Sequence, residues 1–370
     1  MKLLFSALLA IILGSSALPT IAAQAPTGVR PCCAFGYDLK AELGGVAVPF
    51  FSLNNVLDSH TLGRHRYNDG SGSVALNLAG LDKEKNGLIF TTLGGFIDTA
   101  HVRDTADYTY YLYQLMQKNL GSNTHYDFPP ELKLRRIQWL PHRVSLTDEQ
   151  KQALSLDSAA LIAFRLAQWH EIAQWFGMES VGGFKEYASA FSSEDLYSNM
   201  LGALLAKQIL ADEPKLDING FNHAMDKAFT DAIIALEGQP AAITEAKIKH
   251  LDGIWWDSSK RLPNKWVVLF RDYRFGLALA PNYPTATHRQ DLPSTVNGLA
   301  IEQWVRLELH PDQHEQDFAA LPASLNDKPY WTASDFQPIA NYAQQQDGKE
   351  LRARHLDGLL PKHSLSEQRQ

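Results

Sequence analysis

Four ionisable residues in the first third of the chain recur at intervals of three. Asp98, His101, Asp104 and Asp107 lie in the segment Asp-Thr-Ala-His-Val-Arg-Asp-Thr-Ala-Asp, which is expected to be helical. Residues three apart on a helix are neighbours on one face, and it is costly to bury several charged groups without a cation or hydrogen-bond partners. The pattern indicates either a metal site that uses His101, with Asp104 as a carboxylate ligand, or a solvated helix face whose acids favour the helix N-terminus.

A second candidate, the pair His170-Glu171, lies in an otherwise apolar segment, 159–176. Histidine followed by glutamate on a helix begins the zinc metallopeptidase motif, in which the histidine binds the metal and the glutamate activates water. The motif is incomplete, because Gln174 occupies the position of its second histidine. We expect His170 to be a metal ligand and Glu171 a general base. The alternative is a buried His170 bonded to a backbone carbonyl, with Glu171 exposed.

A third segment could supply the carboxylate that two histidines lack. Ser192-Ser-Glu-Asp195 is typical of the first turn of a helix, where acidic residues are common. Two histidines and one carboxylate form a known catalytic zinc set that leaves one coordination position open. The predicted metal ligands are therefore His101, His170 and Glu194, with Asp104 as the competing carboxylate.

Together these segments predict a hydrolase that uses a divalent metal, most simply zinc and alternatively iron, to cleave an amide or an ester. Glu171 would act as general base, and Tyr197 would donate a hydrogen bond to a developing oxyanion. Two other functions remain open. One is a metal-free enzyme that uses His170 and Glu171 as acid and base. The other is a non-enzymatic envelope protein that binds a partner or a glycan through its 8 Trp and 13 Tyr residues.

Apolar periodicity and turn residues predict a mainly helical centre, about residues 96–240, flanked by segments that contain strands. The fold class is therefore α+β. Thr147-Asp-Glu-Gln150 has the pattern of a capping box that opens a short helix. Helices are expected at 98–120, 158–176, 192–210 and 220–236. Strands are expected at 87–92, 265–270 and 301–309. Residues 26–70 are expected to form loop with short strand, and residues 121–150 a loop.

The N-terminus has the order of regions expected of a secretory signal. Lys2 precedes an apolar run, 3–13, and small residues follow up to Ala23-Gln24-Ala25. The run is shorter than the ~20 residues that span a bilayer as a helix. We therefore expect residues 1–25 to be removed, the mature protein to be periplasmic or secreted, and no integral membrane segment to remain. In an oxidising compartment, the adjacent Cys32 and Cys33 could form a strained bridge with each other, pair between chains or stay reduced.

The net charge limits the possible binding partners, and the chain length limits the number of domains. The formal net charge of −7 argues against nucleic-acid binding, which relies on a basic surface. The expected substrate is a small molecule, peptide or glycan of the cell envelope. Residues 26–245 are expected to form a mainly helical domain that carries the candidate site. Residues 246–347 form a strand-containing part, either separate or joined to it, and 348–370 a flexible tail.

The chain resembles a family of secreted bacterial proteins known only as a domain of unknown function. The resemblance covers most of the mature chain and implies no activity and no functional residues. It rests on four segments: Arg30-Pro-Cys-Cys-Ala-Phe-Gly36, Gly95-Phe-Ile-Asp-Thr-Ala-His-Val-Arg-Asp104, Trp169-His-Glu-Ile-Ala-Gln-Trp-Phe-Gly177 and Phe191-Ser-Ser-Glu-Asp-Leu-Tyr-Ser-Asn199.

Overall fold

The computed structural model describes most of the chain. The described residues are 23–28, 30, 35–48, 56–70, 84–142, 144–179, 185–313 and 318–356. Cys32 and Cys33, the expected signal peptide up to residue 22 and the expected tail from residue 357 lie outside these ranges.

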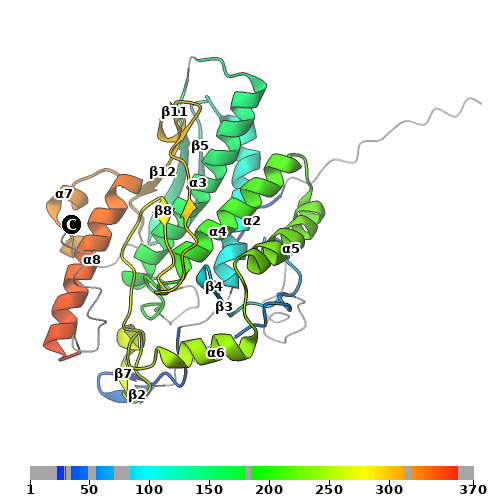
Figure 1. Cartoon of the computed structure of the whole chain (residues 1–370). Coiled ribbons are helices and arrows are strands. Elements are labelled where there is room, and N and C mark those ends of the chain that lie inside the picture. The colour runs from blue at the N-terminus through cyan, green and yellow to red at the C-terminus, as the bar shows by residue number, and fades with distance from the viewer. Residues whose placement is uncertain are drawn as a thin grey trace, which may run out of the picture.

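Three long helices run side by side through the centre of the molecule (Figure 1). They are α2 (Thr99–Asn119), α3 (Asp148–Trp175) and α4 (Asp195–Asp212). Helices α2 and α4 approach so closely that a Cβ at Gly202 would overlap the carbonyl oxygen of Val102. The expected capping box at Thr147 forms, but it opens the whole of α3 rather than a separate short helix, since nothing between 151 and 158 breaks the helical pattern.

Two further helices, α5 (Ile218–Ala235) and α6 (Ala241–His250), follow α4 in the chain. Asp217 caps α5 by accepting a hydrogen bond from the backbone N–H of Gly220 at 2.8 Å. Helix α5 is amphipathic and packs against α4 on the side away from α8 (Figure 1). Its buried residues recur every four positions: Phe221, Met225, Phe229 and Ile233.

A three-stranded antiparallel sheet lies where a loop was expected. Strands β5 (His125–Glu131) and β6 (Lys133–Trp139) form a hairpin, and β12 (Val305–His310) pairs with the other edge of β6. The prediction of a loop over 121–150 was therefore wrong. Two prolines hide the strand pattern of β5, but both lie at a register shift between Phe128 and Glu131, where the ladder is interrupted.

A short hairpin leads into the central helices. Strand β3 (Leu88–Thr91) forms where a strand was predicted, is fully buried and pairs with β4 (Gly95–Asp98). Helix α2 begins at the residue after β4, which places Asp98 at the helix N-cap.

The smaller two- and three-stranded sheets lie towards the two ends of the chain. Strand β1 (Ala41–Leu43) pairs with β2 (Val46–Val48) and with β7 (Leu262–Pro263). The remaining pairs are β8 (Ala278–Leu279) with β9 (Gln290–Asp291) and β10 (Thr295–Val296) with β11 (Leu299–Ala300).

The strand expected at 265–270 does not form. A 3-10 turn, Asn264–Trp266, and an irregular segment take its place, and residues 266–269 are all buried. A short apolar run without alternation shows that a segment is buried but not that it is a strand.

The C-terminal part packs onto the same core as the centre. It contributes β12 to the sheet and two helices, α7 (Ala323–Asn326) and α8 (Ala333–Ala353), of which α8 packs against α3. Residues 348–353, expected to belong to the tail, continue α8, and Leu351 is buried. The arrangement is α+β, as predicted. In the described residues, no helix is both long enough and apolar enough to cross a membrane.

Candidate metal centre

Three side chains from two chain segments converge where α2 and α4 begin. Asp98, His101 and Asp195 each offer one ligand atom, and these three atoms lie within 4.8 Å of one another. The His101 Nε2 to Asp195 Oδ1 distance is 3.5 Å. Among the described residues this is the one group of three histidine, cysteine or acidic side chains with such spacing.

Backbone hydrogen bonds fix the two carboxylates relative to each other. Asp98 Oδ1 accepts hydrogen bonds from the N–H groups of Ala100 and His101 at 2.7 and 3.3 Å, so the helix cap uses only this oxygen. The backbone N–H of Asp98 donates to Ser198 Oγ at 2.9 Å, and that hydroxyl donates to the carbonyl of Glu194 at 2.8 Å. These bonds hold the first turns of α2 and α4 together.

The two carboxylates of this three-residue group are buried, and only the histidine side chain reaches solvent. Asp98 and Asp195 are 1% and 3% exposed, whereas the side chain of His101 is 21% exposed. Two more acids, Glu171 and Glu194, are buried nearby. Within the described parts of the chain, no lysine or arginine forms an ion pair with Asp98, Glu171 or Glu194. This excess of buried negative charge favours a bound cation.

Glu171 is the acid that faces His101 from α3. It is 0% exposed, and its Oε2 accepts a hydrogen bond from the backbone N–H of Phe191 at 2.7 Å. Phe191 has a positive φ of 59°, a strained conformation of the kind that clusters at functional sites. Burial raises the pKa of Glu171, and the positive charges of His101 and His170 oppose that rise. Glu171 Oε1 has no hydrogen-bond partner among the described residues.

Glu194 lies beside the group, but its neighbour Asp195 is the residue whose carboxylate joins it. The two carboxylate oxygens of Glu194 accept hydrogen bonds from Ser192 Oγ and Ser193 Oγ at 2.8 and 3.1 Å. Burial, with the nearby charge of Asp98, raises the pKa of Glu194 to about 7. Glu194 also lines a narrow cleft together with Tyr197.

His170 is not grouped with His101, contrary to the predicted ligand set. Its Nδ1 lies 3.4 Å from Glu131 Oε2, and its Nε2 lies 3.2 Å from Gln174 Nε2. Burial by itself would lower the pKa of His170, but Glu131 outweighs it and the pKa rises to about 9. Successive residues on a helix point about 100° apart. His170 and Glu171 therefore face different partners.

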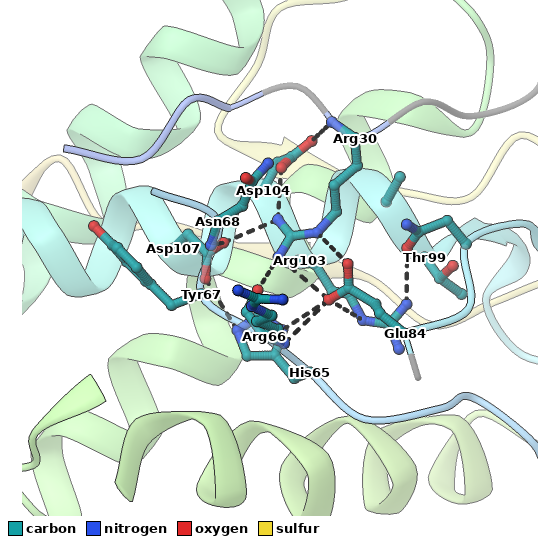
Figure 2. Close-up of polar contacts among 12 residues, drawn as sticks. Arg30, His65, Arg66, Tyr67, Asn68, Glu84, Thr99, Arg103, Asp104 and Asp107 are labelled. Atoms are coloured by element: carbon teal, nitrogen blue, oxygen red, sulfur yellow. Dashed lines mark hydrogen bonds and ion pairs between the residues drawn. The ribbon is translucent and has the colours of Figure 1, made fainter. Parts of the chain in front are cut away.

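Asp104 belongs to a separate cluster in which arginine side chains pair with the acids (Figure 2). The Arg30 guanidinium contacts Asp104 Oδ1 at 2.6 Å, Asp107 Oδ2 at 2.9 Å and Glu84 Oε2 at 2.8 Å. Asp107 also pairs with His65 Nε2 at 3.0 Å. The predicted role of Asp104 as the competing metal ligand therefore has no support in its surroundings, because its charge is already paired with an arginine.

Tyr197, the predicted oxyanion donor, has a partner of its own. Its hydroxyl lies 2.9 Å from His288 Nδ1 and donates to the His288 carbonyl at 3.0 Å. Sequence reasoning did not name Asp98 and Asp195 as metal ligands, although both belong to the group that could hold an ion. The signal for Asp98 was present, since Asp98 and His101 lie three positions apart at a helix start.

Comparison with known proteins identifies a family and no activity. The family described as "Protein of unknown function (DUF4056)" matches residues 20–285. The chain belongs to this family. Neither a search of curated proteins nor a search of solved structures found a match.

Proposed function

We propose that this protein is a metal-dependent hydrolase of an amide or an ester whose ligands are Asp98, His101 and Asp195. The observation that carries the proposal is the convergence of these three ligand atoms within 4.8 Å at the junction of α2 and α4. Three protein ligands with a coordination position left for water or substrate are typical of catalytic rather than structural metal sites. Imidazole and carboxylate donors suit zinc, iron or manganese.

The chemistry divides between the ion and Glu171. When bound, a divalent ion supplies Lewis-acid polarisation of a substrate carbonyl. Glu171 can act as general base, because its Oε2 is held by Phe191 and its Oε1 remains available to accept a proton. Burial, which raises the pKa of this carboxyl, also suits it to return the proton to the leaving group.

The site of action follows from the N-terminal sequence, and it is part of the same proposal. Residues 1–25 have the regions of a secretory signal, so we place the mature protein in the periplasm or outside the cell. Substrates would then be peptides, glycans or small molecules of the envelope.

Elemental analysis of the purified protein and four variants tests the ligand set. Wild type is expected to hold close to one equivalent of zinc, iron or manganese, and His101→Ala and Asp195→Asn to lose it. His170→Ala is the matched control, since this second histidine pairs with Glu131 and should leave the metal content unchanged. Glu171→Gln should retain the metal but lose hydrolysis of model esters and amides.

Two results would overturn the proposal. One is the absence of metal from wild type even after reconstitution with each of the three ions. The other is loss of metal in His170→Ala with retention in His101→Ala, which would restore the ligand set based on His170. Metal-independent hydrolysis that is lost in Glu171→Gln would instead point to acid–base chemistry by Glu171 and His170.

A further inference from the structure

A cavity of about 360 Å³ opens at the C-terminal end of α3. Its volume lies in the range of small-molecule sites, about 300–1,000 Å³. Trp175 follows Glu171 by four residues, so it lies on the same face of α3 about 6 Å further along the helix axis. The lining residues are Trp175, Phe176, Tyr187, Lys265, Ala320 and Tyr342.

The aromatic walls of this cavity are held in fixed orientations. The indole N–H of Trp175 donates to both carboxylate oxygens of Asp347, at 3.0 and 2.9 Å. The Phe176 and Tyr342 rings stand at 83° and 82° to the Trp175 ring, with centroids 4.8 and 6.3 Å away. Trp175, Tyr187 and Tyr342 are all partly exposed. A rigid, partly exposed aromatic surface binds a ligand with little loss of side-chain entropy.

The charges around the cavity disfavour an ionic ligand. Lys265 Nζ pairs with Asp347 at 2.7 Å and with Glu350 at 3.0 Å, so an anion would compete with two carboxylates for this ammonium group. The same ammonium lies 4.9 Å from the ring centroids of Trp175 and Trp266. The protein's own cation therefore already lies over one face of the Trp175 ring, and a ligand cation on that ring would be repelled by it.

We infer that the cavity binds a sugar ring. A neutral ligand must lie on the faces of the aromatic side chains and offer hydrogen-bonding groups at its edge. A pyranose does both, because its C–H groups pack on aromatic faces while its hydroxyls reach polar groups such as the Tyr187 hydroxyl.

One segment of the chain connects the cavity wall with the metal group. It runs from Tyr187, through Phe191 beside Glu171, to Asp195. Residues 190–195 are buried, so this segment offers no surface along which a bound glycan could extend. The binding of a sugar is therefore inferred from the cavity alone and does not depend on the proposed hydrolase.

Titration of the full-length mature protein with chitotriose, cellotriose and maltotriose tests the inference, with tryptophan fluorescence and calorimetry as readouts. At least one trisaccharide is expected to bind saturably. Trp175→Ala and Tyr342→Ala should each weaken binding tenfold or more. Tyr342→Ala guards against misfolding of Trp175→Ala, since Tyr342 is partly exposed on α8. Tyr330→Ala, a partly exposed tyrosine on a different part of the surface, is the matched control and should bind as wild type does.

The inference fails if none of the three sugars binds, or if binding is unchanged in both Trp175→Ala and Tyr342→Ala. It also fails if benzyltrimethylammonium binds in the cavity and the sugars do not, since the site would then be cationic. His101→Ala separates the two proposals. Sugar binding that survives in this variant while the metal is lost supports sugar binding in the cavity independently of the metal site. If wild type holds metal but binds none of the sugars, the sugar-binding inference fails and the proposed metal site stands.

Discussion

The sharpest energetic test concerns Arg30, which lies at the centre of the buried cluster in Figure 2. Its guanidinium pairs with Glu84, Asp104 and Asp107 at 2.6–2.9 Å and donates to the Arg66 carbonyl at 2.6 Å, and its side chain is 3% exposed. Arg30→Met keeps the aliphatic part of the side chain but removes the charge. The three acids are then left with Arg103 as a cationic neighbour, and with the His65 ring, whose Nε2 lies 3.0 Å from Asp107.

The expected loss is about 3–5 kcal/mol in the free energy of unfolding, because removal of one partner leaves buried charges uncompensated. Urea denaturation followed by tryptophan fluorescence at pH 7 measures it. Arg354→Met is the control: Arg354 forms an exposed pair with Glu350 at 3.0 Å, and its loss should change stability by less than about 0.5 kcal/mol. A loss below 1 kcal/mol in Arg30→Met would refute the conclusion that this arginine balances the cluster.

The same cluster predicts a dependence on pH. Burial would raise the pKa of Glu84, but Arg30 and Arg103 outweigh it and lower the pKa to about 2, from an ordinary value of 4.5. A carboxylate with a depressed pKa stabilises the folded state above its unfolded pKa, and this contribution is lost as pH falls through its folded pKa. The stability difference between wild type and Glu84→Gln should therefore narrow as pH falls below about 4.5, by up to roughly 3 kcal/mol at pH 2. A constant difference would contradict the ion pairing.

Three further predictions follow from packing, charge and capping. Gly202→Ala should cost about 3 kcal/mol in urea denaturation, because the new methyl group would overlap the Val102 carbonyl; an unchanged midpoint would show that α2 and α4 can separate without cost. NMR titration should give His170 a pKa of about 9 that falls in Glu131→Gln, and the stability from this pair, present below about pH 6.5, should be lost as pH rises through 9; a pKa unaffected by Glu131→Gln would contradict the pairing. Thr147→Ala should lower stability by about 1 kcal/mol in thermal melts through loss of the capping box of α3, and no change would mean that the cap is dispensable.

Sequence patterns predicted the central helices well, because their signals are local. Asp98 precedes α2, Thr147 begins the capping box of α3, and Asp217 caps α5 through its side chain. The α+β class follows from the same patterns. The hairpin of β5 and β6 was missed because two prolines hide the strand pattern of β5, and because the third strand of this sheet, β12, lies more than 160 residues away in the chain. The alternation of β6 was also obscured, since its buried face includes Lys133 and Arg135.

The candidate site shows most clearly what the sequence could predict and what it could not. Residue type and spacing alone selected the three segments around His101, His170 and Glu194. They also selected the one histidine, His101, that the structure groups with two carboxylates.

Only the tertiary structure decided which side chains meet. Helix α3 turns Glu171 towards His101 and His170 towards Glu131, and the packing of α2 on α4 selects Asp195 over its neighbour Glu194. Contacts between distant segments depend on helix rotation and on close approaches such as that at Gly202. Neither is encoded in the spacing of residues within a single helix, because that spacing fixes the faces of the helix and not the partners that each face will meet.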